Sequence, residues 1–143
     1  GKKNIIFKMP KFRTMKVNTP ALATNKMKNP KKYLTPIGGF LRQTSMDEYP
    51  QLFSILKGDM SFVGPRPALF NQYDLIKLRT SKGVHQLAPG ITGWAQINGR
   101  DNLMILEKVL LDTEYLKRKS FWFDLKILFI TFFRILSRAG ISH

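Results

Sequence analysis

Residues 44–67, TSMDEYPQLFSILKGDMSFVGPRP, combine an apolar helical stripe with two adjacent carboxylates and a proline-bounded arginine. The apolar residues recur at the spacing of one helix face: Leu52, Phe53, Ile55 and Leu56. Gly58 marks the end of this helix. Ser45 and Glu48 have the spacing of an N-terminal capping box, which predicts that the helix begins near Ser45. Asp47 and Glu48 therefore lie in its first turn.

Acidic residues are scarce in this chain, which makes the adjacent pair Asp47 and Glu48 unusual. The chain has nine Asp and Glu against 24 Lys and Arg, a formal net charge of +15, and no acid before Asp47. Two interpretations are open at this point. Acids suit the N-terminal end of a helix dipole, so the pair can be a solvated helix start. Alternatively, the pair is an acidic catalytic centre inside a basic pocket that binds phosphates.

Basic residues flank the two carboxylates along the chain: Lys8, Lys11, Arg13, Arg42, Arg66, Arg79 and Arg100. The planar guanidinium group of arginine matches two phosphate oxygens at once. A carboxylate pair among such cations would hold Mg²⁺, which binds one or two carboxylates together with substrate phosphates. Residue types alone leave the helix-start and catalytic interpretations both open.

The composition limits the class of protein. A length of 143 residues fits one domain, and a pI near 10.4 implies an anionic partner. Nucleic-acid recognition motifs are missing, so the favoured partners are an anionic membrane surface or a phosphorylated small molecule. The absence of cysteine excludes disulfides and thiolate sites. The later acids are predicted on solvated helix faces: Asp101, Glu107, Asp112 and Glu114.

The pattern along the chain predicts a helix-dominated α+β domain that is not a Rossmann fold. Alternating basic and apolar residues over 5–17 predict a small β-hairpin, and residues 18–36 a loop. The glycine-rich residues 83–100 are predicted as a loop with a short strand, without the strand-to-helix setting of a phosphate-binding loop. Further helices are predicted over these ranges: 37–42, from after Pro67 to about Ser81, and 103–117.

The last helical segment, SFWFDLKILFITFFRILSR (120–138), is amphipathic. At 100° per residue, its polar and charged side chains fall in one arc of about 160°: Asp124, Lys126, Thr131, Arg134, Ser137 and Arg138. Charge interrupts it too often to span a bilayer, which needs ~20 predominantly apolar residues. It is either a core helix or a helix that lies in the membrane interface.

Five blocks of this sequence, in order, closely resemble the bacterial sugar transferase family of monotopic phosphoglycosyl transferases. The blocks are KFRTM (11–15), LRQTSMDEYPQL (41–52), LKGDMSFVGPRP (56–67), PGITGWAQINGR (89–100) and SFWFDLKILF (120–129). The resemblance runs from Ile6 to Leu136. It implies transfer of a sugar-1-phosphate from a UDP-sugar to polyprenyl (undecaprenyl) phosphate, with Mg²⁺ as cofactor and release of UMP. This reaction is the first membrane step of polysaccharide or glycan biosynthesis, at the cytoplasmic face of the bacterial inner membrane.

The resemblance also implies roles for individual residues. Asp47 matches the nucleophile that forms a covalent aspartyl phosphosugar. Glu48 matches the second member of the dyad, which either positions the metal or deprotonates the polyprenyl phosphate. Both are expected Mg²⁺ ligands. The expected contacts to substrate phosphates or nucleotide are Lys11, Arg13, Arg42, Arg66 and Arg100.

One departure from the family pattern concerns the N-terminus. Family members carry a hydrophobic membrane segment before the block that matches KFRTM, whereas this chain begins almost at that block. We therefore expect a catalytic domain over residues 1–143 without its N-terminal anchor. The alternative is a non-enzymatic remnant that acts as a basic membrane-surface module. No block that we recognise encodes the choice of sugar or the oligomeric state.

Overall fold

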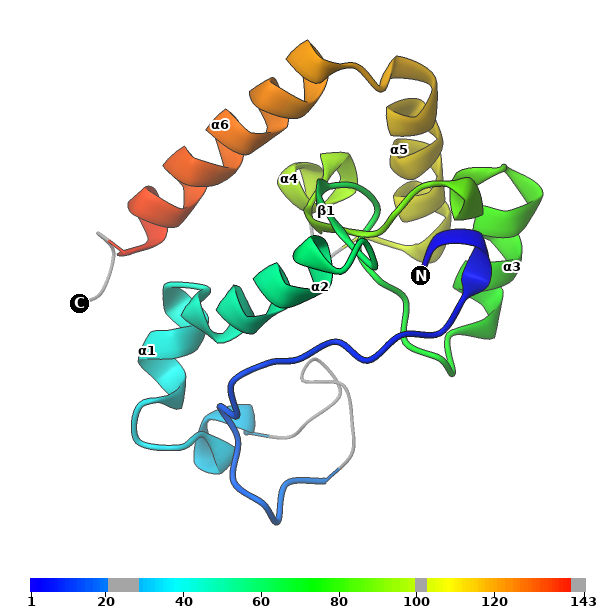
Figure 1. Cartoon of the computed structure of the whole chain (residues 1–143). Helices are drawn as coiled ribbons and strands as arrows, with labels where there is room; N and C mark the ends of the chain where they lie inside the picture. The colour runs from blue at the N-terminus through cyan, green and yellow to red at the C-terminus, as the bar shows by residue number, and fades with distance from the viewer. Residues whose placement is uncertain (21–28, 100–102, 140–143) are drawn as a thin grey trace.

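Helices dominate the fold. The computed structural model describes residues 1–20, 29–99 and 103–139 (Figure 1). In chain order, the elements, with η for 3₁₀ helices, are η1 (Lys2–Asn4), η3 (Pro30–Tyr33), α1 (Gly38–Gln43), η4 (Met46–Gln51), α2 (Leu52–Leu56), β1 (Ser61–Val63), α3 (Tyr73–Ser81), η5 (Val84–Gln86), β2 (Gly90–Thr92), α4 (Trp94–Asn98), α5 (Ile105–Arg118) and α6 (Phe121–Ala139). In Figure 1, α3 and α5 lie side by side at one end of the molecule, and α6 reaches α1 at the other. The prediction of a helix-dominated α+β domain is confirmed.

The helix that carries the two carboxylates begins differently from the prediction. Ser45 precedes it in the left-handed conformation, with φ 57°, and its side chain makes no capping hydrogen bond. The predicted capping box is therefore wrong. The first turn, η4, is a 3₁₀ helix that contains Pro50. Proline has no N–H to donate within an α-helix, so the α-helical part of this segment, α2, starts only at Leu52.

The predicted β-hairpin over residues 5–17 is wrong. These residues run in an extended path, and only Met15 pairs, in an isolated antiparallel bridge with Leu34. The apolar residues of this segment do not form a buried strand face, since Ile6 is 82% exposed and Phe12 is 54% exposed. The alternation of basic and apolar residues therefore reflects a surface segment.

The small sheet lies elsewhere in the chain. Strands β1 and β2 pair in parallel, with Ser61 opposite Gly90 and Val63 opposite Thr92, and α3 lies between them in sequence. β2 leads through Gly93 directly into α4. The expectation that the glycine-rich segment lacks a strand-to-helix setting is therefore wrong. Two strands are all that the described residues contribute to this sheet, so the architecture is not the doubly wound sheet of a Rossmann fold.

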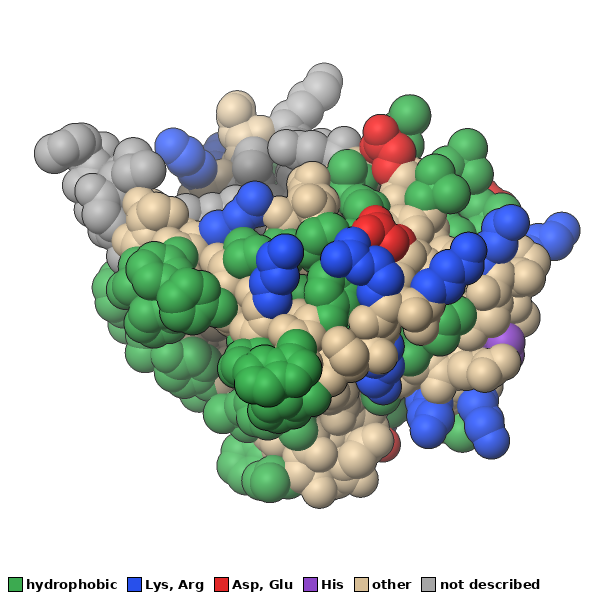
Figure 2. Space-filling model, turned by 90° about the horizontal axis from the view of Figure 1, so that it is seen from above, with side chains coloured by type: hydrophobic (Ala, Val, Ile, Leu, Met, Phe, Trp, Pro, Cys, Tyr) green, Lys and Arg blue, Asp and Glu red, His purple; other side chains and the backbone are tan. Residues whose placement is uncertain are grey.

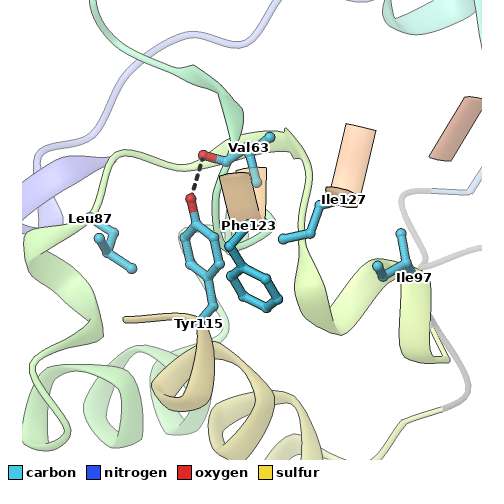
Figure 3. Packing of buried hydrophobic residues seen from close by; sticks show 6 residues of the cluster. All are labelled: Val63, Leu87, Ile97, Tyr115, Phe123 and Ile127. Carbon is cyan, nitrogen blue, oxygen red and sulfur yellow. Dashed lines mark hydrogen bonds between the residues drawn. The ribbon is translucent and has the colours of Figure 1, made fainter. Parts of the chain in front are cut away.

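One apolar cluster joins the sheet to the C-terminal helices. Its buried members are Val63, Leu87, Ile97, Tyr115, Phe123 and Ile127 (Figure 3). The Tyr115 hydroxyl donates a hydrogen bond to Asp124 Oδ1 at 2.7 Å, which ties α5 to α6. Burial and this carboxylate raise the pKa of Tyr115, so the phenol stays protonated and remains a donor.

A buried ion pair joins α3 to α5. Arg79 Nε donates to Asp112 Oδ2 at 2.9 Å, and Arg79 Nη2 lies 2.7 Å from the same oxygen. Asp112 is only 2% exposed, so the prediction that it lies on a solvated face is wrong. Burial raises the pKa of Asp112, and Arg79 opposes that effect. Arg79 Nη1 also donates to the backbone carbonyl of Arg66 at 2.8 Å, which links the pair to the turn after β1.

Removal of the Asp112 carboxylate should destabilise the fold strongly. The variant Asp112→Ala leaves the Arg79 guanidinium buried without its counter-ion, at an expected cost of ~3–5 kcal/mol in the free energy of unfolding. Urea denaturation measures this difference. The matched control is Asp74→Ala on the exposed side of α3, with an expected change within ~0.5 kcal/mol. Equal stability of the two variants would show that the buried pair is unimportant.

Candidate functional site

The two adjacent carboxylates are both buried. Asp47 is 6% exposed and Glu48 is 9% exposed, although both lie in a surface turn, η4. The extended N-terminal segment packs beside them, and Phe12 N–H donates to the Asp47 carbonyl at 3.0 Å. The interpretation of the pair as a solvated helix start is therefore wrong. Burial of two neighbouring acids is costly unless cations compensate their charge.

Two cations supply that compensation. Lys11 Nζ lies 3.3 Å from Asp47 Oδ2 and 3.1 Å from Glu48 Oε1, and Arg66 Nη2 lies 3.7 Å from Glu48 Oε1. The side chains of Lys11 and Arg66 are 35% and 38% exposed, against 9% and 11% for the two acids. The cations thus form the solvent-facing rim of the site. An incoming phosphate would meet positive charge first and find the carboxylates directly behind it.

Close backbone packing positions Arg66. Gly64 N–H donates to the Thr92 carbonyl, and Gly90 N–H donates to the Pro65 carbonyl, both at 2.9 Å. A Cβ atom at Gly93 would collide with the Gly64 carbonyl oxygen, so only glycine permits this approach. The turn that ends in Arg66 is therefore held against β2.

The structure does not bring every predicted substrate contact to the carboxylates. Arg42 Nε donates to Thr14 Oγ1 at 2.9 Å, so it joins α1 to the N-terminal segment. Arg13 is exposed, and no hydrogen bond or ion pair among the described residues links it to Asp47 or Glu48. Arg100 lies outside the described residues. Of the five predicted contacts, the structure brings Lys11 and Arg66 to the dyad.

A small pocket of about 100 Å³ opens beside Glu48 and Arg66. Sequence reasoning missed it, because its walls come from distant parts of the chain. Its uncharged polar side chains are Gln43, Ser45, Thr92, Gln96 and Thr131. Four of these residues lie in the blocks 41–52 and 89–100 that resemble the sugar transferase family, so the resemblance was the available signal: Gln43, Ser45, Thr92 and Gln96.

The dyad can supply ligands to Mg²⁺. The described residues contain no group of three or more His, Cys, Asp or Glu side chains that could hold a metal ion alone. Two carboxylates are nonetheless sufficient, since Mg²⁺ commonly takes its remaining ligands from water and substrate phosphates. Asp47 and Glu48 present adjacent hard oxygen donors, although Lys11 contacts one oxygen of each. The donor chemistry fits Mg²⁺ bound jointly by the dyad and a phosphate.

Helix α6 packs on the domain with the side that carries Phe123, Ile127 and Thr131. Thr131 Oγ1 lies 2.7 Å from Thr92 Oγ1, and the buried Phe123 and Ile127 lie on the same side of the helix. The exposed apolar side chains occupy the other side: Phe121, Trp122, Leu125, Leu128, Phe129, Phe132, Phe133 and Leu136. The segment contributes Phe123 and Ile127 to the core, but the interpretation that all its apolar side chains pack inside the domain is wrong.

Figure 2 shows the same distribution from above. Hydrophobic side chains gather on the left of this view, the side that α6 occupies in Figure 1, and Lys and Arg side chains lie next to them. Helix α2 has a similar arrangement, because its apolar Leu52, Phe53 and Leu56 are exposed while Ser54 is buried. No helix within the described ranges is long and apolar enough to cross a membrane.

Comparison with known proteins places the chain in a family. The family model described as "Bacterial sugar transferase" matches residues 1–138, so the chain belongs to the bacterial sugar transferase family. Within that family, it is 47% identical over 112 residues to the "Uncharacterized sugar transferase EpsL" of Bacillus subtilis, covering 77% of this chain and 54% of that protein.

Relatives with more specific names match longer stretches. The chain is 46% identical over 137 residues to the "UDP-glucose:undecaprenyl-phosphate glucose-1-phosphate transferase" of Escherichia coli, covering 89% of this chain and 29% of that protein. It is 34% identical over 157 residues to the "Undecaprenyl-phosphate galactose phosphotransferase" of Salmonella typhimurium, covering 98% of this chain and 32% of that protein. The chain thus spans between about a third and about half of these relatives.

Loss of Lys11 should destabilise the site through repulsion between the two acids. The variant Lys11→Met keeps most of the aliphatic side chain but removes the charge between Asp47 and Glu48. We expect a loss of ~1–3 kcal/mol in the free energy of unfolding, measured by urea denaturation at pH 7. The control, Lys8→Met, changes an exposed lysine of the same segment and should cost less than ~0.5 kcal/mol. Indistinguishable stabilities would contradict the assigned role of Lys11.

Proposed function

We propose that this chain is the catalytic domain of a phosphoglycosyl transferase. It would move a sugar-1-phosphate from a UDP-sugar to polyprenyl phosphate and release UMP. The observation that carries the proposal is the buried Asp47–Glu48 pair behind the solvent-facing cations Lys11 and Arg66. Buried acids with a cationic rim are suited to a reaction at phosphorus, since the rim binds the anion and an acid can attack it. Family membership and the names of the relatives support the same reaction.

In the first step, a carboxylate oxygen of Asp47 attacks the phosphorus that bears the sugar. A bond forms between this oxygen and phosphorus, the bond from phosphorus to the bridging oxygen breaks, and UMP leaves with the electron pair. The product is an aspartyl phosphosugar. Arg66 and Lys11 lie where they can neutralise the charge that develops on the phosphate oxygens.

In the second step, an oxygen of the polyprenyl phosphate attacks the same phosphorus. The bond to Asp47 breaks, the carboxylate is regenerated, and a polyprenyl diphosphate sugar is released. Glu48 is close enough to the site to take the proton of an incoming monoprotonated phosphate or to help hold the metal. The separation into two steps lets one cationic site serve both substrates.

Mg²⁺ is the proposed cofactor, held by Asp47 and Glu48 together with substrate phosphate. When bound, it would offset negative charge on the phosphate oxygens. Arg13, Arg42 and Arg100 stay predicted contacts to the nucleotide or phosphates. Arg42 contacts Thr14 in the structure, so any effect on substrate passes through the N-terminal segment or needs movement of its side chain.

We also propose that α6 lies in the membrane interface, at the cytoplasmic face of the bacterial inner membrane. The exposed apolar side of this helix is what supports this, because such a patch is rarely left in water without a partner. Lys126, which is exposed, would lie near lipid headgroups, whereas Arg134 lines the pocket beside Glu48 and Arg66. Polyprenyl phosphate, the second substrate, would then reach the site by diffusion in the membrane on which α6 lies.

A non-enzymatic membrane-surface module is the competing function. Such a module would need the basic surface and the apolar side of α6, but not a pair of buried acids beside Lys11. Buried acids impose a cost that membrane binding alone does not require. Release of UMP from a UDP-sugar, with Mg²⁺ and polyprenyl phosphate present, separates the two functions.

The variant Asp47→Asn should lose turnover and keep its fold. The amide preserves the shape of the side chain but is not a nucleophile, so we expect UMP release to fall by ~10³-fold or more. Mass spectrometry of the wild-type protein with a UDP-sugar alone should show a phosphosugar on the peptide that contains Asp47. The control Asp59→Asn changes an exposed acid and should keep both UMP release and the phosphosugar adduct. Normal UMP release by Asp47→Asn would refute the nucleophile assignment.

The variant Phe129→Glu should weaken membrane binding without unfolding the protein. Phe129 is exposed on the apolar side of α6, and burial of such a side chain is worth ~1.5–3 kcal/mol. We expect ~10-fold weaker binding to vesicles that contain anionic lipid, measured by sedimentation, with unchanged circular dichroism. Ser137→Glu introduces the same charge at an exposed polar position of the same helix and should weaken binding less. Unfolding of Phe129→Glu, or no vesicle binding by the wild type, would contradict the interfacial orientation.

A further inference from the structure

We propose that Arg134 of α6 binds the phosphate of the membrane-anchored acceptor in the second step of the reaction. This inference rests on the proposed function, which it extends by a third cation and by a role for α6 inside the site. Its basis is the place of Arg134 in the wall of the pocket beside Glu48, the lack of a carboxylate partner among the described residues, and the apolar side chains that line the same pocket.

The pocket brings α6 to the reacting groups. Its wall contains Arg134 together with Glu48 and Arg66, and these residues come from three different elements of the chain. Arg134 is itself exposed, so its guanidinium group reaches solvent beside the pocket. An anion that enters the pocket therefore meets one arginine from the turn after β1 and another from α6.

The packing of α6 keeps Arg134 on the pocket side of the helix. Arg134 follows Ile127 by seven positions and Thr131 by three, which is the spacing of one helix face. Ile127 is 0% exposed, and Thr131 Oγ1 lies 2.7 Å from Thr92 Oγ1. These two contacts fix the rotation of α6 about its own axis, so the backbone of Arg134 is held next to the pocket while its side chain reaches solvent.

Charge balance distinguishes Arg134 from the other two cations of the site. Lys11 Nζ lies 3.3 Å from Asp47 Oδ2 and 3.1 Å from Glu48 Oε1, and Arg66 Nη2 lies 3.7 Å from Glu48 Oε1. Arg134 forms no salt bridge within residues 1–20, 29–99 and 103–139. It therefore gives up only water when it binds a phosphate, whereas Lys11 and Arg66 already neutralise the dyad.

The position on α6 favours the acceptor over the UDP-sugar as the bound anion. The exposed apolar side of α6 is the feature that we propose to lie in the membrane interface. The phosphate of the acceptor is held at that interface by its polyprenyl chain, whereas a UDP-sugar arrives from water. Three apolar side chains also line the pocket: Ile91, Ile97 and Ile135. They suit the first carbons of an isoprenoid chain, which follow the phosphate directly, better than the hydroxyl groups of a sugar or ribose.

A contact with arginine leaves the acceptor able to react. A phosphate monoester has three terminal oxygens, and a guanidinium group binds two of them at once. The third oxygen stays available to attack the phosphorus on Asp47, with the bonds formed and broken as in the second step above. Arg134 exchanges no proton in this role, and Glu48, in the same pocket wall, is the group that can take one.

The test measures the two steps separately in neutral detergent micelles. The phosphosugar adduct on the Asp47 peptide is formed with UDP-glucose or UDP-galactose alone, and its decay is followed after addition of undecaprenyl phosphate. We expect Arg134→Met to slow this decay at subsaturating acceptor by about 10–100-fold and to change the rate of adduct formation by less than about twofold. Arg134→Lys, which keeps the charge but not the two-point contact, should lose less. The control Lys126→Met changes an exposed cation of the same helix outside the pocket and should match the wild type in both steps.

Other results would overturn the inference. Slower adduct formation with unchanged decay would assign Arg134 to the UDP-sugar, and an equal change in both steps would indicate a general effect on the site. If Arg134→Met does not fold, as judged by circular dichroism, Arg134→Gln takes its place with the same expected change.

A phospholipid headgroup offers the same phosphate chemistry, so vesicle binding is the second arm of the test. Vesicles of phosphatidylglycerol and phosphatidylcholine without undecaprenyl phosphate are used, and binding is measured by sedimentation. We expect Arg134→Met to bind these vesicles within about twofold of the wild type. If it loses as much affinity for the vesicles as it loses in the second step, Arg134 contacts headgroups and the inference is wrong.

A binding measurement separates this inference from the proposed function. The affinities of the wild type and of Arg134→Met for undecaprenyl phosphate are compared with their affinities for undecaprenol, which lacks the phosphate, in micelles without UDP-sugar. If the wild type forms no adduct and releases no UMP, the proposed function fails. The phosphate contact is still supported if the wild type prefers undecaprenyl phosphate and Arg134→Met reduces that preference by about 10-fold or more. Equal affinities of the wild type for the two lipids, or an unchanged preference in the variant, would overturn it.

Discussion

The backbone contact between Gly64 and the β2–α4 segment is the constraint on which the site depends. The hydrogen bonds of Gly64 and Gly90 hold the turn after β1 against the second strand, and a side chain at Gly93 would force the two apart. Arg66 follows two residues after Gly64 and reaches Glu48 only because this turn is fixed. The buried Arg79 supports the same turn from α3, through the Arg66 carbonyl. The two-stranded sheet thus positions Arg66 beside Glu48.

Helix α6 connects the exposed apolar surface to the candidate site. Its inner side supplies Thr131 to the pocket, and its outer side carries the exposed aromatic and aliphatic residues. Apolar side chains occupy both sides of this helix, because Phe123 and Ile127 pack into the core while a longer row of apolar side chains faces outward. The outer row is the feature on which the proposed membrane orientation depends.

The sequence predicted the features that depend on local pattern. The helices α1 and α5, and the proximity of Lys11 and Arg66 to Asp47 and Glu48, could be inferred from spacing, charge and family-like blocks. The rest depended on partners distant in the chain. Strands of three residues are too short for a periodic signal, and the burial of Asp112 follows from a partner on another helix. The pocket has walls from four separate segments, so no single window of sequence could reveal it.

The most direct test of the account is a crystal structure of the Asp47→Asn variant with a UDP-sugar and Mg²⁺. The substitution should prevent turnover, so the intact substrate can be observed. The account predicts the sugar-bearing phosphorus next to residue 47 and its oxygens between Lys11 and Arg66. A diphosphate bound away from these cations, with the dyad facing only water or protein, would contradict the assignment of this site.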